Sequence, residues 1–371
     1  MGWDALANAA YWTTEFIGAG LYRLDRWTPG TSIEGSAFDG HVLGRARIDR
    51  VRIQFVSDAN AALATLLSGA IQLAADNALG FQQGLTAKQQ WASNGGGQML
   101  FTTDLWRAIY PQFRPEVAGS PAVLDLRVRR ALGYVIDKQS VNEVLYGGEG
   151  ILAETILPPG VDYSATVDRA ITHYPYDPRR TEQIMTEAGY ARSSGGFFSR
   201  PGEERPTFEL KTNASVQYEQ ETSIVAAGWR QSGFDVREAV NPAALAGDGQ
   251  TRATFPSFFA FSTNLGERAL GNFRAAEIPR TENRWTGNNR GGWANPEYDR
   301  LFGVLNSTLD RTERIEQISR LAKLLTDELP AFSLYYDLSP VAHTSALQGP
   351  GPISPDTTGL MTWNAVEWEL R

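Results

Sequence analysis

Cysteine is absent from the 371 residues, and the chain holds only three histidines and four methionines. Without cysteine there is no disulfide, no thiol nucleophile and no thiolate metal site. His41, His173 and His343 are scattered far apart in the sequence, which leaves little from which to build a His-rich metal site. The sequence therefore predicts neither a resident metal nor a cofactor.

Long apolar runs and an excess of basic residues are missing as well. No run approaches the roughly 18 apolar residues that a membrane-spanning helix needs. Lys and Arg number 34 against 42 Asp and Glu, a formal net charge of -8, so there is no broad basic face for phosphates. This balance argues against nucleic acid and anionic membranes as partners. At roughly 100 to 200 residues per domain, the length predicts two or three globular domains.

Motifs of catalysis and nucleotide binding are also missing. The glycine patches at 95–97 and 193–196 do not open a helix with a Lys-Ser/Thr pair, and no Gly-x-Ser-x-Gly elbow surrounds a serine. Five acids have the spacing of helix N-caps: Asp58, Asp125, Asp137, Asp177 and Asp310. Ten tryptophans nevertheless leave open a hydrolase of glycans or peptides that works through a pair of carboxylates.

Two stretches follow a strand-helix-strand pattern. In the first, residues 51–56 alternate, 59–67 follow the N-cap Asp58, and 70–75 form a second apolar run. The second stretch, at 208–237, repeats the pattern around a helix expected at 218–231. These patterns predict two α/β lobes with a parallel strand pair in each.

Capping residues mark further helices. Asp125 precedes an amphipathic run, Leu126 to Ile136, and Asp137 opens a second short helix. Helices are also expected to begin at 177–178, 295–296 and 310. These segments predict a chain rich in explicitly capped helices, followed by a strand at 332–336.

Several of these segments, in this order, carry a family resemblance. They are Gly18 to Leu24 with Trp27 and Pro29-Gly30, Asp58 to Gly69, Leu126 to Leu132 with Ile136-Asp137-Lys138, Tyr176-Asp177-Pro178 to Gly189-Tyr190, Asn295 to Asp299, and Leu329-Pro330 to Tyr335. The chain resembles the extracytoplasmic solute-binding proteins of family 5, the large dipeptide- and oligopeptide-type receptors of ABC importers. The resemblance covers nearly the whole chain.

The resemblance implies an α/β, periplasmic-binding-protein-like fold of type II, with two lobes joined by a hinge. Lobe I would comprise residues 1–105 and the return 331–371, lobe III residues 116–330, and the first hinge crossing residues 106–115. Family members are longer at the N-terminus, so we expect a truncated or internal start and a signal peptide missing from this chain. The expected location is periplasmic or extracellular and membrane-associated.

The function implied is capture of a peptide or similar polar solute in an interlobe cleft, without chemistry, and its delivery to ABC permease subunits in the membrane. A hydrolase acting in the same cleft is the alternative. A third possibility is a sensory ligand-binding domain of a regulator or receptor. The first reading predicts a binding protein that is not an enzyme.

Three clusters of candidate ligand-binding residues lie at segments expected to border the cleft. The first crossing offers Trp106, Gln112 and Arg114, of which Gln112 could bond an amide and Arg114 a carboxylate. The second cluster is Ser262, Thr263, Asn264 and Arg268. In dipeptide and oligopeptide receptors the matching strand ends in an Asp that receives the ligand's ammonium. That Asp is missing here, which favours a neutral polar ligand or a peptide held through its backbone.

The third cluster is a loop broken by glycines just before the 295–296 helix start. It offers Trp285, Asn288, Asn289 and Trp293. Flat aromatic faces bury sugar or peptide surface at low rotamer cost, and amides supply both donors and acceptors. This loop is the strongest candidate site, although Trp293 also fits a packing role beside the helix cap.

Overall fold

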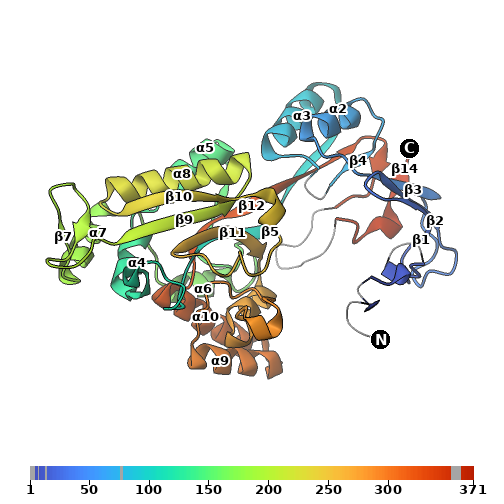
Figure 1. Cartoon of the computed structure of the whole chain (residues 1–371). Coiled ribbons are helices and arrows are strands. Elements are labelled where there is room, and N and C mark those ends of the chain that lie inside the picture. The colour runs from blue at the N-terminus through green and yellow to red at the C-terminus, as the bar shows by residue number, and fades with distance from the viewer. Residues whose placement is uncertain (1–4, 7, 13–14, 76–77, 352–360) are drawn as a thin grey trace. The chain divides into compact units, whose positions relative to one another are not determined.

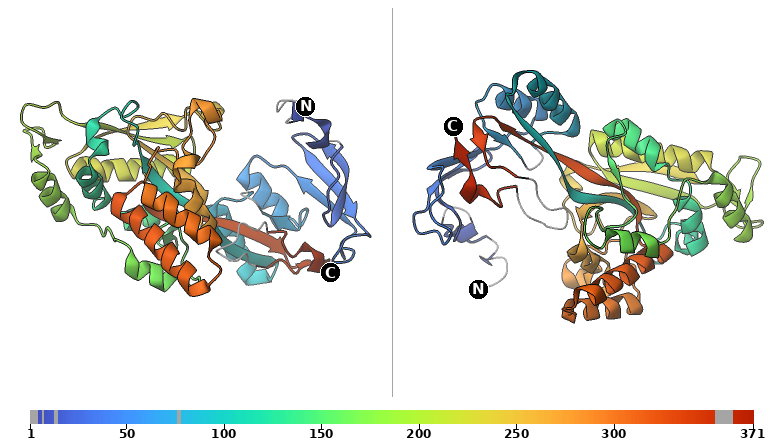
Figure 2. Two further views of the ribbon diagram at one scale, coloured as in Figure 1. Left: turned by 90° about the horizontal axis from the view of Figure 1, so that it is seen from below. Right: turned by 180° about the vertical axis from the view of Figure 1, so that it is seen from behind.

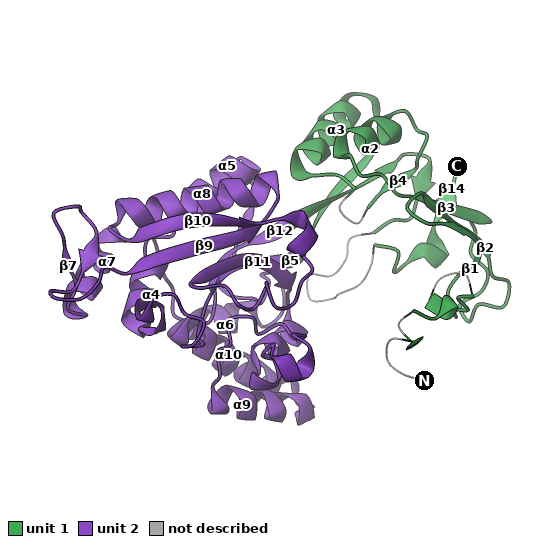
Figure 3. Cartoon of the chain, in the orientation of Figure 1, with its two compact units in different colours: residues 1–102, 338–371 green, residues 103–337 purple. Residues whose placement is uncertain are grey.

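The computed structural model describes residues 5–6, 8–12, 15–75, 78–351 and 361–371. The chain divides into two compact units, residues 1–102 with 338–371 and residues 103–337 (Figure 3). It passes from the first unit to the second within strand β5 (Gly97–Pro111) and returns within β12 (Phe332–Thr344). The lobes and hinge implied by the resemblance stay a prediction.

Unit 1 contains an antiparallel sheet, two helices and the C-terminal segment. The sheet order is β1-β2-β3. Its elements are β1 (Tyr22–Thr28), β2 (Ser32–Ala37), β3 (Arg50–Gln54), α2 (Ala59–Leu67), β4 (Leu73–Ala74), α3 (Phe81–Asn94), β13 (Leu347–Gln348) and β14 (Glu369–Leu370). A small core joins the helices to β12, because Leu66, Trp91 and Ala342 are buried in one cluster.

The strand-helix-strand prediction at 51–75 is right in its elements and wrong in its pairing. Asp58 caps α2 as expected, its carboxylate accepting a 2.7 Å hydrogen bond from the Ala61 amide. However, β3 pairs antiparallel with β2, and β4 pairs antiparallel with β12. Within the described residues, unit 1 therefore has no parallel pair. Alternating hydrophobicity fixes which residues form a strand, but not which strand it pairs with.

Unit 2 is organised around a mixed sheet. Its strands follow the order β10-β9-β11-β5-β12, with β6 (Ile151–Leu152) paired to β12. Here β9 (Thr207–Asn213) runs parallel to both β10 (Asp235–Asn241) and β11 (Phe258–Asn264), which confirms the parallel pair predicted at 208–237. β11 is antiparallel to β5, with Asn264 opposite Leu105.

Helices cover both faces of this sheet. In Figures 1 and 2, α8 (Val216–Gln231) and α5 (Lys138–Tyr146) lie over one face, and α6, α9 and α10 lie on the other side. The remaining elements of the unit are α4 (Leu126–Gly133), α6 (Ser164–Ala170), α7 (Pro178–Glu187), β7 (Ala191–Arg192), β8 (Phe198–Ser199), α9 (Pro296–Ser307) and α10 (Arg311–Glu328).

The predicted helix starts are confirmed at Asp125, Asp137, Asp177, Asn295 and Asp310, each of which accepts a backbone hydrogen bond as an N-cap. The first of these helices, α4, is shorter than the run 126–136 suggested. The amides of residues 135 and 136 bond three residues back, to carbonyls 132 and 133, so the chain tightens into a turn after α4.

Aromatic residues fill the core on each face of the unit 2 sheet. On the α8 side, the rings of Trp229 and Phe258 lie 5.0 Å apart, and on the other side Tyr110 stacks on Phe261 at 4.0 Å. Alternate residues of β11 thus supply the two cores, as the period of a strand requires. Among the described residues, no helix is both long and apolar enough to cross a membrane.

Candidate functional site

Polar side chains end strand β11. Its first four residues are buried aromatics and alanine, whereas Ser262, Thr263 and Asn264 are half-buried. The carboxyl ends of parallel strands are where ligands gather in α/β sheets, because loops and free main-chain groups meet there. β11 and β9 are such a parallel pair.

A carboxylate reaches this strand end from β12. The Ser262 hydroxyl donates a 2.8 Å hydrogen bond to one oxygen of Asp337, and the Tyr146 hydroxyl donates at 3.1 Å to the other. Gln217 in turn donates at 2.8 Å to the Tyr146 oxygen. Burial raises the pKa of Asp337 above its usual value, while Arg107 and the Ser262 hydrogen bond act to lower it. The acid is held in place by neutral donors and lacks a directly bonded cation among the described residues.

A buried ion pair supports this acid. Arg107 of β5 and Glu221 of α8 have side chains 1% and 0% exposed, with Nε and Oε2 2.9 Å apart. The hydroxyl of Tyr335, two residues before Asp337, donates to Glu221 at 2.5 Å. Burial acts to lower the pKa of Arg107, but the charge and hydrogen bonds of Glu221 raise it above its usual value. The pair ties β5, α8 and β12 together and so fixes where Asp337 lies.

An amide network joins two of the predicted clusters. The Asn272 side chain donates to Thr263 Oγ1 at 3.1 Å and to Asn264 Oδ1 at 3.0 Å. Its own oxygen accepts a 3.3 Å hydrogen bond from Asn288. Residues of the β11 end and of the glycine-broken loop therefore meet at Asn272, in the 3₁₀ segment η4 (Glu267–Phe273).

Other predicted ligand residues serve the interior of unit 2. Gln112 is fully buried and donates to the carbonyls of Ala253 and Phe255. Arg114 donates to the carbonyls of Ala253 and Arg290 at 2.8 and 3.0 Å. These partners are main-chain oxygens, which explains the residue types without a ligand.

The candidate residues of the glycine-broken loop have two kinds of surroundings. Asn288 joins the Asn272 hydrogen-bond network, whereas Asn289 and Trp293 are packed in the interior. Asn289 is buried and donates to the carbonyls of Phe273 and Trp293. Trp293 is buried and its indole donates at 2.8 Å to Glu328, as the packing alternative would have it. Trp285 is half-buried, with a left-handed φ of 59°.

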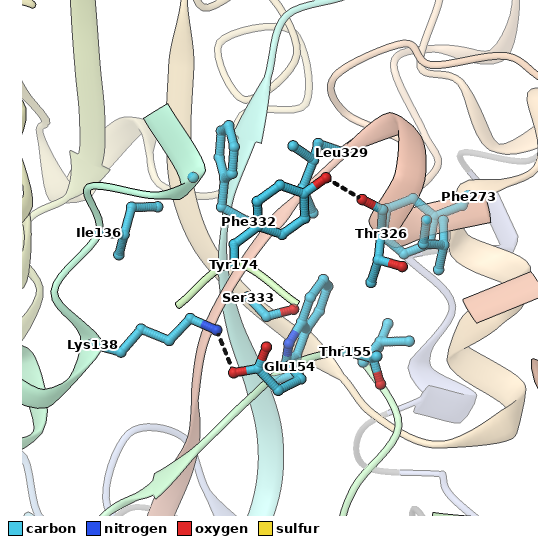
Figure 4. Close-up of a pocket in the computed structure, with 15 residues that line it drawn as sticks. Ile136, Lys138, Glu154, Thr155, Tyr174, Phe273, Thr326, Leu329, Phe332 and Ser333 are labelled. Atoms are coloured by element: carbon cyan, nitrogen blue, oxygen red, sulfur yellow. Dashed lines mark hydrogen bonds and ion pairs between the residues drawn. The ribbon is translucent and has the colours of Figure 1, made fainter. Parts of the chain in front are cut away.

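The last two predicted residues lie away from the network. Arg268 is exposed. Trp106 is only 2% exposed and lines a pocket of about 30 Å³. Lys138, Glu154 and Thr155 line the same pocket (Figure 4). Lys138 bonds Glu154 at 2.9 Å, and the Trp106 indole nitrogen has no partner among the described residues. This space suits one or two waters, since a water needs roughly 10–15 Å³ measured in this way.

Sequence reasoning missed Tyr146, Gln217, Asn272 and Asp337. Only Asp337 carried a signal, because an acid closing the apolar run from 332 is unusual for a buried strand. The others come together through folding alone. Within the described ranges, no group of three or more His, Cys, Asp or Glu residues is placed to hold a metal ion.

Residues 3–265, more than half of the chain, match the family described as bacterial extracellular solute-binding proteins, family 5 middle. The chain belongs to this family. Among curated family members, it is 23% identical over 350 residues to the oligopeptide-binding protein AppA of Bacillus subtilis, covering 90% of this chain and 59% of AppA. It is 24% identical over 354 residues to heme-binding protein A of Haemophilus influenzae, covering 92% and 57%.

Solved structures of the family share the fold. The oligopeptide-binding protein of Thermus thermophilus, complexed with a pentapeptide, aligns with a TM-score of 0.76 at 22% identity, over 95% of this chain and 62% of that one. NikZ of Campylobacter jejuni, in complex with Ni(L-His), aligns at 0.77 and 21% identity, over 97% and 70%. The present chain spans about three fifths of the length of AppA and of heme-binding protein A. The periplasmic-binding-protein-like fold expected from the sequence is confirmed.

Proposed function

We propose that this chain is the major part of a solute-binding receptor of an ABC importer, which binds a peptide or similar polar solute and delivers it unaltered to membrane permease subunits. The observation that carries the proposal is the polar end of β11, where Ser262, Asp337 and the Asn272 network gather in a member of this family. We further propose a periplasmic or extracellular location and no enzymatic activity.

The chemistry of this strand end supports a polar ligand with donor groups. Asp337 offers a carboxylate whose oxygens already accept neutral hydrogen bonds, and a carboxylate can accept several more. Thr263, Asn264 and Asn272 bring hydroxyl and amide groups of both kinds. A peptide main chain presents the matching N–H and C=O groups, and an ammonium group would be compensated by Asp337. Asp337 of β12 would thus supply, at this strand end, the acid that β11 lacks.

Titration of the whole chain with defined peptides tests the proposal. A pentapeptide library serves as probe, read by the fluorescence of the ten tryptophans and by melting temperature. A ligand that binds the folded state raises the melting temperature saturably. Asp337→Asn should weaken binding of a positive peptide roughly tenfold, the loss expected for one charge-assisted contact. Asp168→Asn is the matched control, because the Asp168 side chain is 67% exposed on α6.

Three outcomes would count against this assignment. Flat titrations across the library would oppose a peptide receptor, as would equal affinity of wild type and Asp337→Asn. Cleavage of a bound peptide, detected by mass spectrometry and abolished by one carboxylate substitution, would support the hydrolase alternative. Closure of two lobes on the solute, predicted from the resemblance, is tested by a fall in radius of gyration in solution scattering.

A further inference from the structure

Two arginines of unit 2, Arg252 and Arg290, face no counter-charge within the part of the chain that the structure describes. Arg290 is 8% exposed and Arg252 is half-buried, and the Nε atom of each is cut off from solvent without a hydrogen-bond partner. Among the described residues, neither guanidinium makes an ion pair or a side-chain hydrogen bond. The Arg290 guanidinium lies 4.8 Å over the ring of Phe261.

The other buried arginines of this unit are satisfied. Arg107 pairs with Glu221, and Arg129 donates to the carbonyls of Val123, Leu124 and Glu328. Arg114 also has several carbonyl partners, one of them the carbonyl of Arg290 itself. Folded proteins pair buried charges because an uncompensated one is costly. Arg290 and Arg252 depart from the rule that the rest of the unit follows.

The electrostatics around Arg252 and Arg290 favour the binding of an anion. Burial and the charge of Arg252 together lower the pKa of Arg290 to about 9. The two residues are neighbours in the fold, because one nitrogen of Arg114 donates both to the carbonyl of Arg290 and to that of Ala253, which follows Arg252 in the chain. Burial also lowers the pKa of Arg252. No carboxylate is among the groups that shift either pKa. A negative group placed at both guanidinium ions would remove the repulsion and satisfy the free N–H donors.

We propose that Arg252 and Arg290 form an oxyanion-binding site on unit 2, with the Arg290 guanidinium over the ring of Phe261. A guanidinium can make a bidentate contact with carboxylate, sulfate or phosphate through two of its N–H groups. Because Arg252 is partly exposed, an ion can reach the pair from solvent. The oxyanion is either the carboxylate of the transported solute or a free inorganic anion. The first source rests on the proposed receptor function, whereas the second does not.

Thermal melting of the whole chain in sulfate, acetate and chloride at matched ionic strength tests this site. Sulfate stabilises many proteins without binding them, so the informative quantity is the difference between variants. Wild type should show a saturable rise with sulfate or acetate, and Arg290→Gln should weaken the apparent affinity roughly tenfold. Arg284→Gln is the matched control, because Arg284 is exposed on the same loop.

The two sources give different results. Tighter binding of acetate than of sulfate assigns the site to the carboxylate of a solute, and tighter binding of sulfate assigns it to an inorganic oxyanion. Equal anion responses of wild type, Arg290→Gln and Arg252→Gln would overturn the proposal. Arg252→Gln provides the test if Arg290→Gln fails to fold, since Arg252 is less buried.

Discussion

The hydroxyl of Ser262 donates a 2.8 Å hydrogen bond to the carboxylate of Asp337, although 75 positions separate the two residues in the chain. Ser262 stands near the end of β11, where the sequence lacks the acid expected from the family. Asp337, within β12, brings a carboxylate to the same place.

Asp337 should change how the free energy of unfolding depends on pH. Because burial raises the pKa of Asp337 above 3.8, the folded state holds its proton to higher pH than the unfolded state. The free energy of unfolding of wild type should therefore fall, relative to Asp337→Asn, as pH rises from about 4 through the raised pKa, and then level off. Urea unfolding of both proteins between pH 4 and 8 measures the difference. If the free energy of unfolding of wild type minus that of Asp337→Asn stays constant or rises with pH, the pKa of Asp337 is not raised in the folded state.

The ion pair between Arg107 and Glu221 should be sensitive to removal of one partner. Arg107→Met or Glu221→Gln leaves a buried charge alone, and we expect a loss of about 3–5 kcal/mol in the free energy of unfolding. The matched control is the exposed pair of Arg300 and Glu297, with side chains 60% and 53% exposed, where Arg300→Met should change the free energy of unfolding far less, because solvent screens the pair. Similar losses at both pairs in denaturant titrations would refute this view.

Asn272 should matter for binding more than for stability. Asn272→Ala removes the donor shared by Thr263 and Asn264 and the acceptor of Asn288. We expect roughly tenfold weaker peptide binding, because these groups would lose their common orientation. The melting temperature without peptide separates this effect from unfolding. If a well-folded Asn272→Ala variant binds peptide with unchanged affinity, Asn272 is not part of the binding site.

The N-cap of α7 offers a test of a purely local prediction. The Asp177 carboxylate accepts hydrogen bonds of 3.0 Å from the amides of Arg179 and Arg180. Asp177→Ala should lower the free energy of unfolding by about 1 kcal/mol, whereas Asp177→Asn, which can still cap, should lower it less. Urea unfolding decides between them, and equal losses would mean that the cap contributes little.

The sequence alone determined the local structure. Capping acids predicted helix starts at Asp125, Asp137, Asp177 and Asp310 because an N-cap depends only on residues two or three positions away. The strand-helix-strand unit at 208–237, with its parallel pair, followed from periodicity in the same way. The ordered motifs also indicated the family. All of this information lies in short segments.

Which polar groups meet depends on the tertiary structure. Gln112 and Asn289, chosen from the sequence as ligand residues, bond main-chain carbonyls inside unit 2. Asn272 and Asp337 reach the β11 end through contacts that no local pattern encodes. The reason is physical: a side chain's partners depend on strand pairing and on packing between distant segments. Hydrophobic periodicity fixes the face on which a residue lies, but not its neighbour across the sheet.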